Sequence, residues 1–460
     1  MDGDIVDLSG MVTCSTITLQ SGEIAATAAN LAIVGPTDHT ITIDGAGAGR
    51  VFDHKGAGTL SLRNLSLQNG VASPVKYNGN GGCVYSTGSA YLYNVSMSGC
   101  HGNNGGALNT RATATGAATR VYLSTISGNT ADGHGGGIYS KNRLVLQVST
   151  ITNNSAAGHG GGLYGEGGIA VHGAASIAHN SAGGRGGGIL SGNGSSLLYL
   201  GYTSVDHNTA GQDGGGIWSN DNIQIVNSTI SSNTASNHGG GGILASGAVT
   251  TITGSTVDNN TAVGNDFTAS GGGLSATRLG SDVHVLVSNS TIAGNSAYEM
   301  GGLWVYNKMG TFDLINSTVA FNLVRTTRGN AAGVGTGSCG VTMQSSIIAN
   351  NSGGEDLTVY DCFGTQQLNG TYNLIVTSNK APAFTITANP RLVPLGLHGG
   401  LLRTIALLPG SAAIDAGTNV TFLSTDERGS GYPREVGRAA DIGAYERQPN
   451  DDEIFYAGFQ

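Results

Sequence analysis

Residues 134 to 140 read HGGGIYS, and the phrase returns as HGGGLYG at residues 159 to 165. Related phrases follow as RGGGIL at 185 to 190, DGGGIW at 213 to 218 and GGGGIL at 239 to 244. A short phrase that recurs at a nearly constant spacing is typical of repeat proteins, in which one repeat cannot bury its apolar face alone. The glycine-rich phrase therefore predicts a fold of stacked repeats. Its first glycines are Gly81, Gly105, Gly135, Gly160, Gly186, Gly214, Gly240, Gly271 and Gly301.

A second phrase, Ser/Thr-apolar-x-x-Asn, alternates with the first, as in TISGN at residues 125 to 129. Short runs between the two phrases, such as RLVLQV at 143 to 148, alternate apolar and polar residues, which predicts strands. Equivalent strands of stacked coils lie about 4.8 Å apart, so apolar side chains would fill the interior and the asparagines would form an amide ladder. The asparagines with this offset are Asn129, Asn154, Asn180, Asn208, Asn233, Asn260, Asn295, Asn322 and Asn350.

The two phrases together predict an all-β fold. The predicted architecture is a right-handed parallel β-helix, a solenoid of about ten coils with roughly 27 residues each and terminal caps. A leucine-rich repeat is the structural alternative, but its return segment is helical, whereas the return segment here is rich in Gly, Ala, Ser and Asn. Glycine suits the corner of each coil because it adopts positive φ and allows close approach. We expect an N-terminal cap over residues 1–40, repeats over 41–362, a C-terminal cap over 363–447 and a short tail over 448–460.

The composition excludes several classes of protein. Of the 460 residues, 78 are glycine and 11% are charged, and the net charge is −9. Because Lys and Arg form no cluster along the chain, we expect no nucleic-acid partner. No apolar run approaches the roughly 18 to 20 residues of a membrane-spanning helix, so we expect no membrane span.

The five cysteines indicate disulfide bonds. Cys339 and Cys362 are 23 residues apart, close to one repeat, and stacked positions lie within the Cα separation that a disulfide tolerates, so we expect this bond. Cys83 and Cys100 flank one short repeat and could form a second bond, which leaves Cys14 alone. The alternative is that all five are small buried residues. No spacing of Cys or His is typical of a zinc site.

Several stretches resemble known families. TIDGAGAGRVF at 42 to 52, LSLRNLSLQNG at 60 to 70 and the two alternating phrases resemble the repeats of polymorphic outer-membrane-protein-like, right-handed parallel β-helix proteins. GSAAIDAGT at 410 to 418, followed by DERGSGYPREVGRAADIGAYE at 426 to 446, is similar to the end of bacterial choice-of-anchor Q domain proteins. Together the resemblance covers most of the chain from about residue 40 to residue 446.

The resemblance implies export to the cell surface or medium and a scaffold that polysaccharide lyases, glycosidases and adhesins share. It supplies no catalytic residues, because the shared motifs are structural. The sequence departs from the family at one position, since the aromatic residue of the usual Phe-x-x-Asn phrase is Ile or Val in nearly every repeat.

Two columns of residues in the stacked coils are candidates for a functional site. The residue before each Gly-Gly forms the first column, and its four ionisable members occupy consecutive coils within about 15 Å. The residue after the apolar position forms the second column, which strand alternation points outward beside the first. The ionisable residues are His134, His159, Arg185 and Asp213, and the aromatic members of the second column are Tyr85, Tyr139, Tyr164 and Trp218.

These groups suit the elimination of a uronate from a polysaccharide. Arg185 would neutralise the carboxylate of the substrate. His159 or His134 would abstract the proton α to that carboxylate. Tyr164 or Tyr139 would then protonate the leaving oxygen.

The remaining members of the two columns would complete this site. Asp213 would belong to the catalytic group, and Tyr85, Tyr139 and Trp218 would bind sugar rings with exposed aromatic faces. The alternative is that the charged residues are solvated turn residues and that the aromatic residues only cover strand edges.

A second cluster lies beside the predicted asparagine ladder. Asp206 and Asp258 share an outward offset two coils apart, with His179 and His207 near them. Two coils correspond to roughly 9 to 10 Å, near the carboxylate spacing of an inverting glycosidase. Because Asp is common at turns, a structural role is the alternative. Ice binding by the Ser/Thr column is not favoured, since no regular Thr-x-Thr face accompanies it.

The sequence thus predicts a secreted or cell-surface bacterial β-helix protein that binds a polysaccharide along its long face. The favoured interpretation is a polysaccharide lyase or glycoside hydrolase, with elimination on a uronate-containing glycan favoured over hydrolysis. The alternative is a non-enzymatic adhesin or display protein. We expect a monomer. We also expect no cofactor, with calcium as the alternative, although no motif supports it and the acidic runs DGDIVD and PNDDE are interpreted as solvated chain ends.

Overall fold

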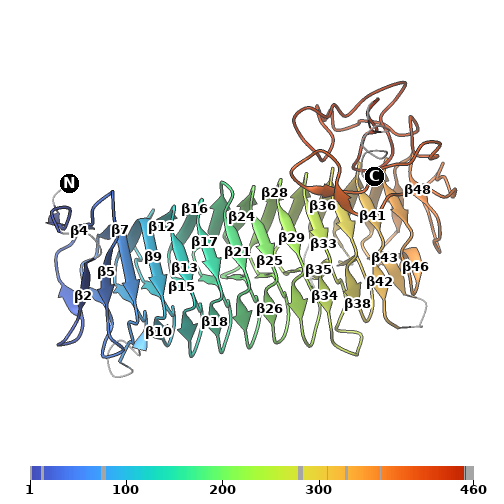
Figure 1. The fold of residues 1–460 in the computed structure, drawn as a ribbon. Helices are drawn as coiled ribbons and strands as arrows, with labels where there is room; N and C mark the ends of the chain where they lie inside the picture. Colours follow the sequence, from blue (N-terminus) through green and yellow to red (C-terminus); the bar gives the residue numbers. More distant parts are fainter. Residues whose placement is uncertain are drawn as a thin grey trace. The chain divides into compact units, whose positions relative to one another are not determined.

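The computed structural model describes residues 3–11, 15–73, 79–277, 283–307, 309–326, 330–362, 364–449 and 451. The chain divides into two compact units, Met1–Asp221 (unit 1) and Asn222–Gln460 (unit 2), and both are drawn in Figure 1. Every named element in the described residues is a β-strand, and the strands of successive coils pair in parallel. The prediction of an all-β parallel β-helix is therefore confirmed.

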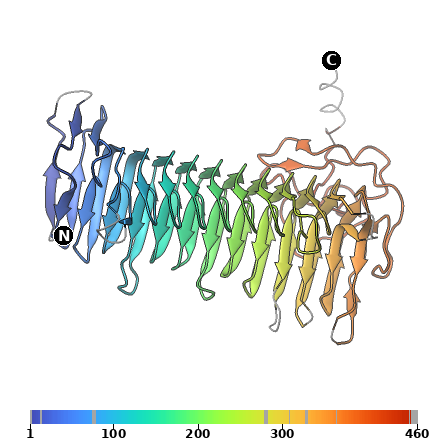
Figure 2. The ribbon, with the colours of Figure 1, turned by 90° about the horizontal axis from the view of Figure 1, so that it is seen from below.

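One coil of unit 1 consists of four short strands joined by turns, namely β13 (Thr125–Ser127), β14 (Thr130–Ala131), β15 (Ile138–Ser140) and β16 (Arg143–Gln147). Each strand pairs in parallel with its equivalent in the next coil, and Figure 2 shows the resulting rows of strands. The equivalent strands are β17 (Thr150–Thr152), β18 (Ser155–Ala156), β19 (Leu163–Gly165) and β20 (Ile169–His172).

The strand register aligns apolar side chains into columns inside each unit. In unit 1, Ile126 pairs with Ile151, and Ile151 pairs with Ile177. All three side chains are fully buried. Burying one such side chain contributes about 1.5–3 kcal/mol, so coil stacking supplies the stability that a single repeat cannot supply.

Glycine forms the corner before β15 and its equivalents. Gly135 has a φ of 66° and Gly160 has a φ of 65°, a left-handed conformation that side chains disfavour. A Cβ atom on Gly135 would also lie 2.5 Å from the Ile138 carbonyl oxygen. The corner therefore requires glycine, as the sequence predicted.

The predicted asparagine ladder is present. In unit 1, Asn154 Nδ2 donates to Asn180 Oδ1 at 3.0 Å and to the Ile126 carbonyl oxygen at 2.9 Å. Asn180 Nδ2 continues the ladder by donating to Asn208 Oδ1 at 3.0 Å. Each amide thus satisfies backbone groups at the turn and holds two coils in register.

The prediction that Asn350 belongs to the ladder is wrong. In unit 2, Asn322 Nδ2 donates to Asn351 Oδ1 at 2.9 Å, so the last member is Asn351 and not Asn350. The reason is the register of β45 (Ile347–Ala349), in which Ile348 pairs with Val319 of the previous coil. The ladder position therefore falls one residue later than the Ser346-Ile347 pair had indicated.

The described residues form about 13 coils, which corrects the prediction of about ten. Counted by one equivalent strand per coil, unit 1 has eight coils and unit 2 has five among these residues. The prediction counted Gly-Gly phrases, and some coils have none. The four coils outside the nine predicted phrases contain the strands β3 (Ile24–Ala26), β6 (Phe52–His54), β43 (Ala331–Thr336) and β46 (Glu355–Val359).

In unit 2, the chain after β48 (Leu374–Ile375) leaves the coil and folds back over strands of the same unit. Its side chains Leu407, Ala413 and Tyr445 belong to a buried cluster with Ile347 of the coil. This segment contains an antiparallel pair, β49 (Gly396–Leu397) and β50 (Arg403–Thr404). The segment packs against side chains of the coil in unit 2. That residues 363–447 cap the end of the coil stays a prediction.

Both expected disulfides form. The Cα atoms are 5.4 Å apart in Cys83–Cys100 and 5.2 Å apart in Cys339–Cys362. Cys14 and most of the predicted tail over 448–460 lie outside the described residues. Among the residues that are described, no helix has the length and apolar character that a membrane crossing would need.

Candidate functional site

The ionisable residues before the Gly-Gly phrases lie side by side in unit 1, and we call His134, His159, Arg185 and Asp213 the His–Arg column. The rings of His134 and His159 stack with centroids 4.9 Å apart and planes 3° apart. Arg185 Nε donates to Asp213 Oδ2 at 3.1 Å. The structure therefore brings together all four residues that the sequence singled out.

The histidines of this column are hydrogen-bonded to backbone. His134 Nδ1 accepts the backbone N–H of His159 at 3.1 Å, and His159 Nδ1 accepts that of Arg185 at 2.9 Å. One coil earlier, Asn104 Oδ1 accepts the backbone N–H of His134 at 3.0 Å. Imidazole Nδ1 thus replaces an amide oxygen in a ladder between coils. Since Nδ1 is an acceptor, the proton of each neutral ring is on Nε2.

The environment favours neutral imidazoles. Burial lowers the pKa of His134, and burial together with the charges of His134 and Arg185 lowers the pKa of His159. A general base needs a free lone pair within reach of the substrate proton. Here the backbone occupies Nδ1 and a proton occupies Nε2, so this arrangement does not suit proton abstraction.

The positive charge of Arg185 is already paired within the protein. Its guanidinium pairs with Asp213, a residue that is 8% exposed, and lies over the Trp218 ring at 5.3 Å from the centroid. A substrate carboxylate would have to compete with Asp213 for the same cation. The geometry therefore favours an internal ion pair over a free anion-binding arginine.

The aromatic column is stacked and largely covered. Tyr139 and Tyr164 stack at 5.0 Å between centroids, and Tyr164 also stacks on His134 at 5.2 Å. The Tyr139 hydroxyl donates to Glu166 Oε1, and burial and this bond raise the pKa of Tyr139 above its usual range. Burial, followed by the charge of Glu166, also raises the pKa of Tyr164.

The expectation of exposed aromatic faces is wrong for two residues, because Tyr85 is 6% exposed and Tyr139 is 8% exposed. Parallel stacking explains this result. Equivalent rings one coil apart cover each other, and the Arg50 guanidinium lies 5.3 Å from the centroid of Tyr85. Only Trp218 among the predicted sugar-binding residues is partly exposed.

The predicted glycosidase pair is also not available to a substrate. In unit 2, Asp258 is fully buried and pairs with Arg403 Nη2 at 2.5 Å. Burial raises its pKa to about 6 despite the opposing effect of Arg403. In unit 1, Asp206 pairs with His207 Nδ1 at 3.0 Å. The hypothesis of two solvent-facing carboxylates is therefore wrong, since the C-terminal segment covers Asp258.

Unit 1 also has a groove lined by cations, which the repeated phrases did not predict. It is about 560 Å³ in volume and lies between the loop over residues 112–117 and the start of β16. Arg120, Lys141 and Arg143 line it, and all three side chains are exposed. None of them forms an ion pair within the described residues. We call these three cations and this loop the basic groove.

Tyrosines lie on the strands beside the basic groove. In β9 (Ser89–Ser98), Tyr91 pairs with Arg120 of β12 (Ala118–Tyr122), and Tyr93 pairs with Tyr122. The Tyr91 and Tyr122 rings are 5.6 Å apart, and Tyr93 is 40% exposed. The guanidinium of Arg63 on the next strand lies 5.2 Å from the Tyr91 ring centroid.

The signal for this surface is present in the sequence. SAYLYNVSMS at 89 to 98 and ATRVY at 118 to 122 alternate buried apolar residues with outward Tyr and Arg. Neither run belongs to a repeated phrase, so the repeated positions alone do not indicate this surface. The loop over residues 112–117, which completes the groove, has no repeat pattern.

A model of the Chlamydia polymorphic membrane protein repeat matches residues 124–141 and 148–166. The matched stretches are parts of two consecutive coils of unit 1, and they include the ladder asparagines Asn129 and Asn154 as well as His134 and His159. The chain matches no curated protein and no solved structure. The similarity therefore concerns the repeat unit, and it places both histidines within that repeat.

Proposed function

We propose that the protein is a cell-surface β-helix protein that binds an anionic polysaccharide in the basic groove without cleaving it. One observation carries the proposal. Three exposed cations without carboxylate partners in the described part of the chain line a groove beside tyrosines, in a chain whose net charge is −9. Such a local excess of positive charge on an acidic chain favours an anionic ligand.

The chemistry of the groove suits an acidic sugar chain. Guanidinium groups of Arg120 and Arg143 can bind carboxylate or sulfate in a bidentate manner, and Lys141 adds a mobile point charge. Tyrosine rings such as that of Tyr93 present apolar faces and a polar edge to a sugar ring. Exposed charge pairs contribute only about 0.2–1 kcal/mol each, so tight binding requires several contacts along a polymer.

The geometry of the His–Arg column supports binding over cleavage. Elimination requires a free base, a free cation and an ionisable acid in contact with the substrate. His134 and His159 direct Nδ1 to backbone N–H groups, and Asp213 occupies Arg185. These groups are therefore already engaged within the protein, which supports binding without cleavage.

Two features support a location outside the cytoplasm. Cys83–Cys100 and Cys339–Cys362 are disulfides, and such bonds persist in oxidising compartments. The similarity of residues 124–141 and 148–166 to a Chlamydia polymorphic membrane protein repeat fits display at a cell surface. An adhesin or display protein is the class that combines these features with a binding groove.

A glycan-binding assay tests the proposal. Polygalacturonate and alginate are expected to bind and neutral dextran is not, and affinity is expected to fall as salt rises because the contacts are exposed charges. Arg120→Gln/Arg143→Gln is expected to weaken binding at least about tenfold. The matched control Lys380→Gln/Arg391→Gln removes two exposed cations from unit 2 and is expected to leave affinity unchanged.

Absorbance of an unsaturated uronate product and release of reducing ends are followed on the same polymers. Both signals are expected to stay at the level of buffer alone. Product formation that His159→Ala abolishes would overturn the non-enzymatic part of the proposal. Equal affinity of the Arg120→Gln/Arg143→Gln variant and the parent protein would overturn the assignment of the groove.

A further inference from the structure

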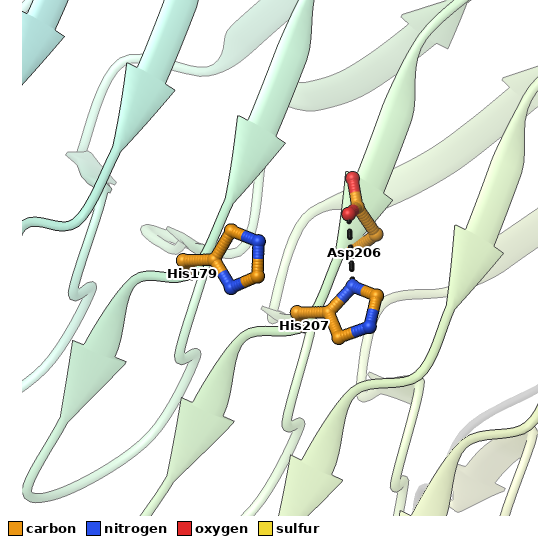
Figure 3. Close-up of side chains that lie close together, drawn as sticks. All are labelled: His179, Asp206 and His207. Atoms are coloured by element: carbon orange, nitrogen blue, oxygen red, sulfur yellow. Dashed lines mark hydrogen bonds and ion pairs between the residues drawn. The ribbon is translucent and has the colours of Figure 1, made fainter.

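Two histidines and an aspartate form a compact cluster on unit 1, outside the basic groove and the His–Arg column. His179 follows β21 (Ser176–Ala178), and Asp206 and His207 lie at the same turn one coil later, at the end of β25 (Ser204–Asp206). Figure 3 shows the three side chains close together, with Asp206 and His207 joined by a hydrogen bond. Each offers one ligand atom, and these atoms all lie within 4.8 Å of one another.

The backbone at this turn adopts an unusual conformation for histidine. His179 has a φ of 55° and His207 has a φ of 53°, in the left-handed region. The preceding coils place Asn69, Gly99, Gly128 and Asn153 at the equivalent position, with similar positive φ. Left-handed φ costs an ordinary residue on the order of 1 kcal/mol, and Gly and Asn tolerate it best. The fold therefore does not need an imidazole at this turn.

The environment of His179 and His207 differs from that of the two histidines in the His–Arg column. His134 and His159 use Nδ1 to accept backbone N–H groups, whereas the ring nitrogens of His179 make no hydrogen bond to any described residue. His179 and His207 are both exposed, and their rings stack at 4.9 Å between centroids. Their nitrogens are therefore accessible to a ligand from solvent.

The carboxylate of the cluster is held in place. Ser204 Oγ donates to Asp206 Oδ1 at 2.9 Å, which leaves Oδ2 directed at His207 Nδ1 at 3.0 Å. A hydrogen bond to the non-ligating oxygen is the kind of support that orients the carboxylate ligands of metals. The cluster thus combines two imidazoles with a positioned carboxylate oxygen.

We propose that His179, Asp206 and His207 form a site for a divalent transition metal, with Zn²⁺ as the preferred ion. Two imidazole nitrogens and one carboxylate oxygen are a ligand set typical of Zn²⁺, whereas Ca²⁺ and Mg²⁺ prefer oxygen ligands alone. Because the ligands come from two neighbouring coils, the ion links these coils.

The spacing of the ligand atoms fits such an ion after a small adjustment. Bonds of about 2.0–2.2 Å place neighbouring ligand atoms roughly 3.0–3.5 Å apart, which matches the Asp206–His207 separation. The wider separations, up to 4.8 Å, close by rotation of exposed side chains on a turn. Three protein ligands leave at least one coordination position for water.

Equilibrium dialysis of the full chain against zinc sulfate, after treatment with a chelator, tests the site. The expected result is about one Zn²⁺ per chain, and His179→Asn/His207→Asn is expected to abolish binding. Asparagine is the appropriate replacement, because Asn153 adopts the same φ in the preceding coil. Asp206→Asn is expected to weaken binding at least about tenfold.

The matched control is His101→Asn, which removes a histidine that is paired with Asp132 at 3.1 Å elsewhere in unit 1. This variant is expected to bind Zn²⁺ like the parent protein. Excess Ca²⁺ is expected not to displace Zn²⁺ from either protein. Substitution with Co²⁺ provides a second readout, since nitrogen ligation gives visible absorption bands that the double variant should lack. Equal uptake by the parent protein and the His179→Asn/His207→Asn variant would overturn the proposal. So would the absence of Zn²⁺ uptake.

Discussion

At the scale of single residues, the histidines of the His–Arg column accept hydrogen bonds from the backbone of the next coil. His134 Nδ1 and His159 Nδ1 each accept a backbone N–H, as Asn104 Oδ1 does one coil earlier. Nδ1 of histidine and Oδ1 of asparagine are both bonded to Cγ, so either atom reaches the same donor. Chemically different residues in one column therefore perform one structural task.

This interpretation predicts different effects of two substitutions at His134. His134→Asn keeps an acceptor for the backbone N–H of His159, and His134→Ala leaves that N–H without one. The alanine variant is expected to lose about 1–2 kcal/mol more of the free energy of unfolding than the asparagine variant. Urea unfolding followed by circular dichroism measures the difference. Equal losses in the two variants would contradict the ladder role.

At the scale of elements, the asparagine ladder fixes the register between coils. Asn180 Nδ2 donates to the Ile151 carbonyl oxygen at 2.9 Å and to Asn208 Oδ1 at 3.0 Å. Its Oδ1 accepts both the backbone N–H and Nδ2 of Asn154 at 3.0 Å. Because all of these groups are buried, loss of one amide leaves several polar atoms unsatisfied.

Asn180→Asp is expected to lower the free energy of unfolding by about 3 kcal/mol. A carboxylate cannot donate, so the Ile151 carbonyl oxygen and Asn208 Oδ1 lose their donor and face a buried charge. The control Asn193→Asp introduces the same change at an exposed residue that only accepts hydrogen bonds there. Urea unfolding at neutral pH compares the variants. A loss in Asn180→Asp no larger than that in Asn193→Asp would show that the ladder does not stabilise the fold.

At the scale of the whole molecule, the C-terminal segment of unit 2 packs against the coil of that unit. The C-terminal segment of unit 2 brings charged groups onto the side of the coil, including Arg403 against Asp258. Burial raises the pKa of Asp258 and of Asp441 to about 6 and that of Glu446 to about 8. The contacts that hold this segment should therefore respond to pH.

The sign of this response follows from the direction of the shifts. The folded pKa of Asp258 lies above the ordinary value of about 3.9 for an Asp carboxyl, so the folded state binds its proton more tightly than the unfolded state. Its contribution to stability is complete below about pH 4 and is lost as pH rises through about 6. We expect this carboxyl to reduce the free energy of unfolding on the order of 3 kcal/mol between these limits.

Comparison with Asp258→Asn isolates this carboxyl. The amide oxygen can accept from Arg403, Asn259 and Ser231, as Asp258 Oδ2 does. Relative to the parent protein, the variant is expected to gain stability as pH rises from 4 to 7. Thermal unfolding at several pH values measures this difference, and parallel pH profiles of the two proteins would contradict the expectation.

The sequence predicted most of the fold because repetition makes spacing visible. The recurring Gly-Gly and x-x-Asn phrases predicted parallel coils, glycine corners and the ladder, and the cysteine spacing indicated both disulfides. The number of coils was underestimated because the coils that contain β3, β6, β43 and β46 lack the predicted glycine phrase. The last ladder residue was misplaced by one position because register depends on pairing with the previous coil.

The candidate site was harder to predict, because the role of a side chain depends on what lies one coil away. Alignment alone brought His134, His159 and Arg185 together, but it could not show that Nδ1 of each ring binds backbone. It also could not show that stacking would bury Tyr139. The basic groove uses Arg120 and a loop outside the repeated phrases, so the periodic pattern gave no sign of it.

A crystal structure of the protein with a bound oligogalacturonate tests the central claim most directly. The account predicts that the sugar lies in the basic groove, with its carboxylates at Arg120 and Arg143 and a ring against Tyr93. It also predicts that the hydrogen bond from the backbone N–H of His159 to His134 Nδ1 is retained. A sugar bound across His159 and Arg185 with the ladder bonds broken would contradict the account.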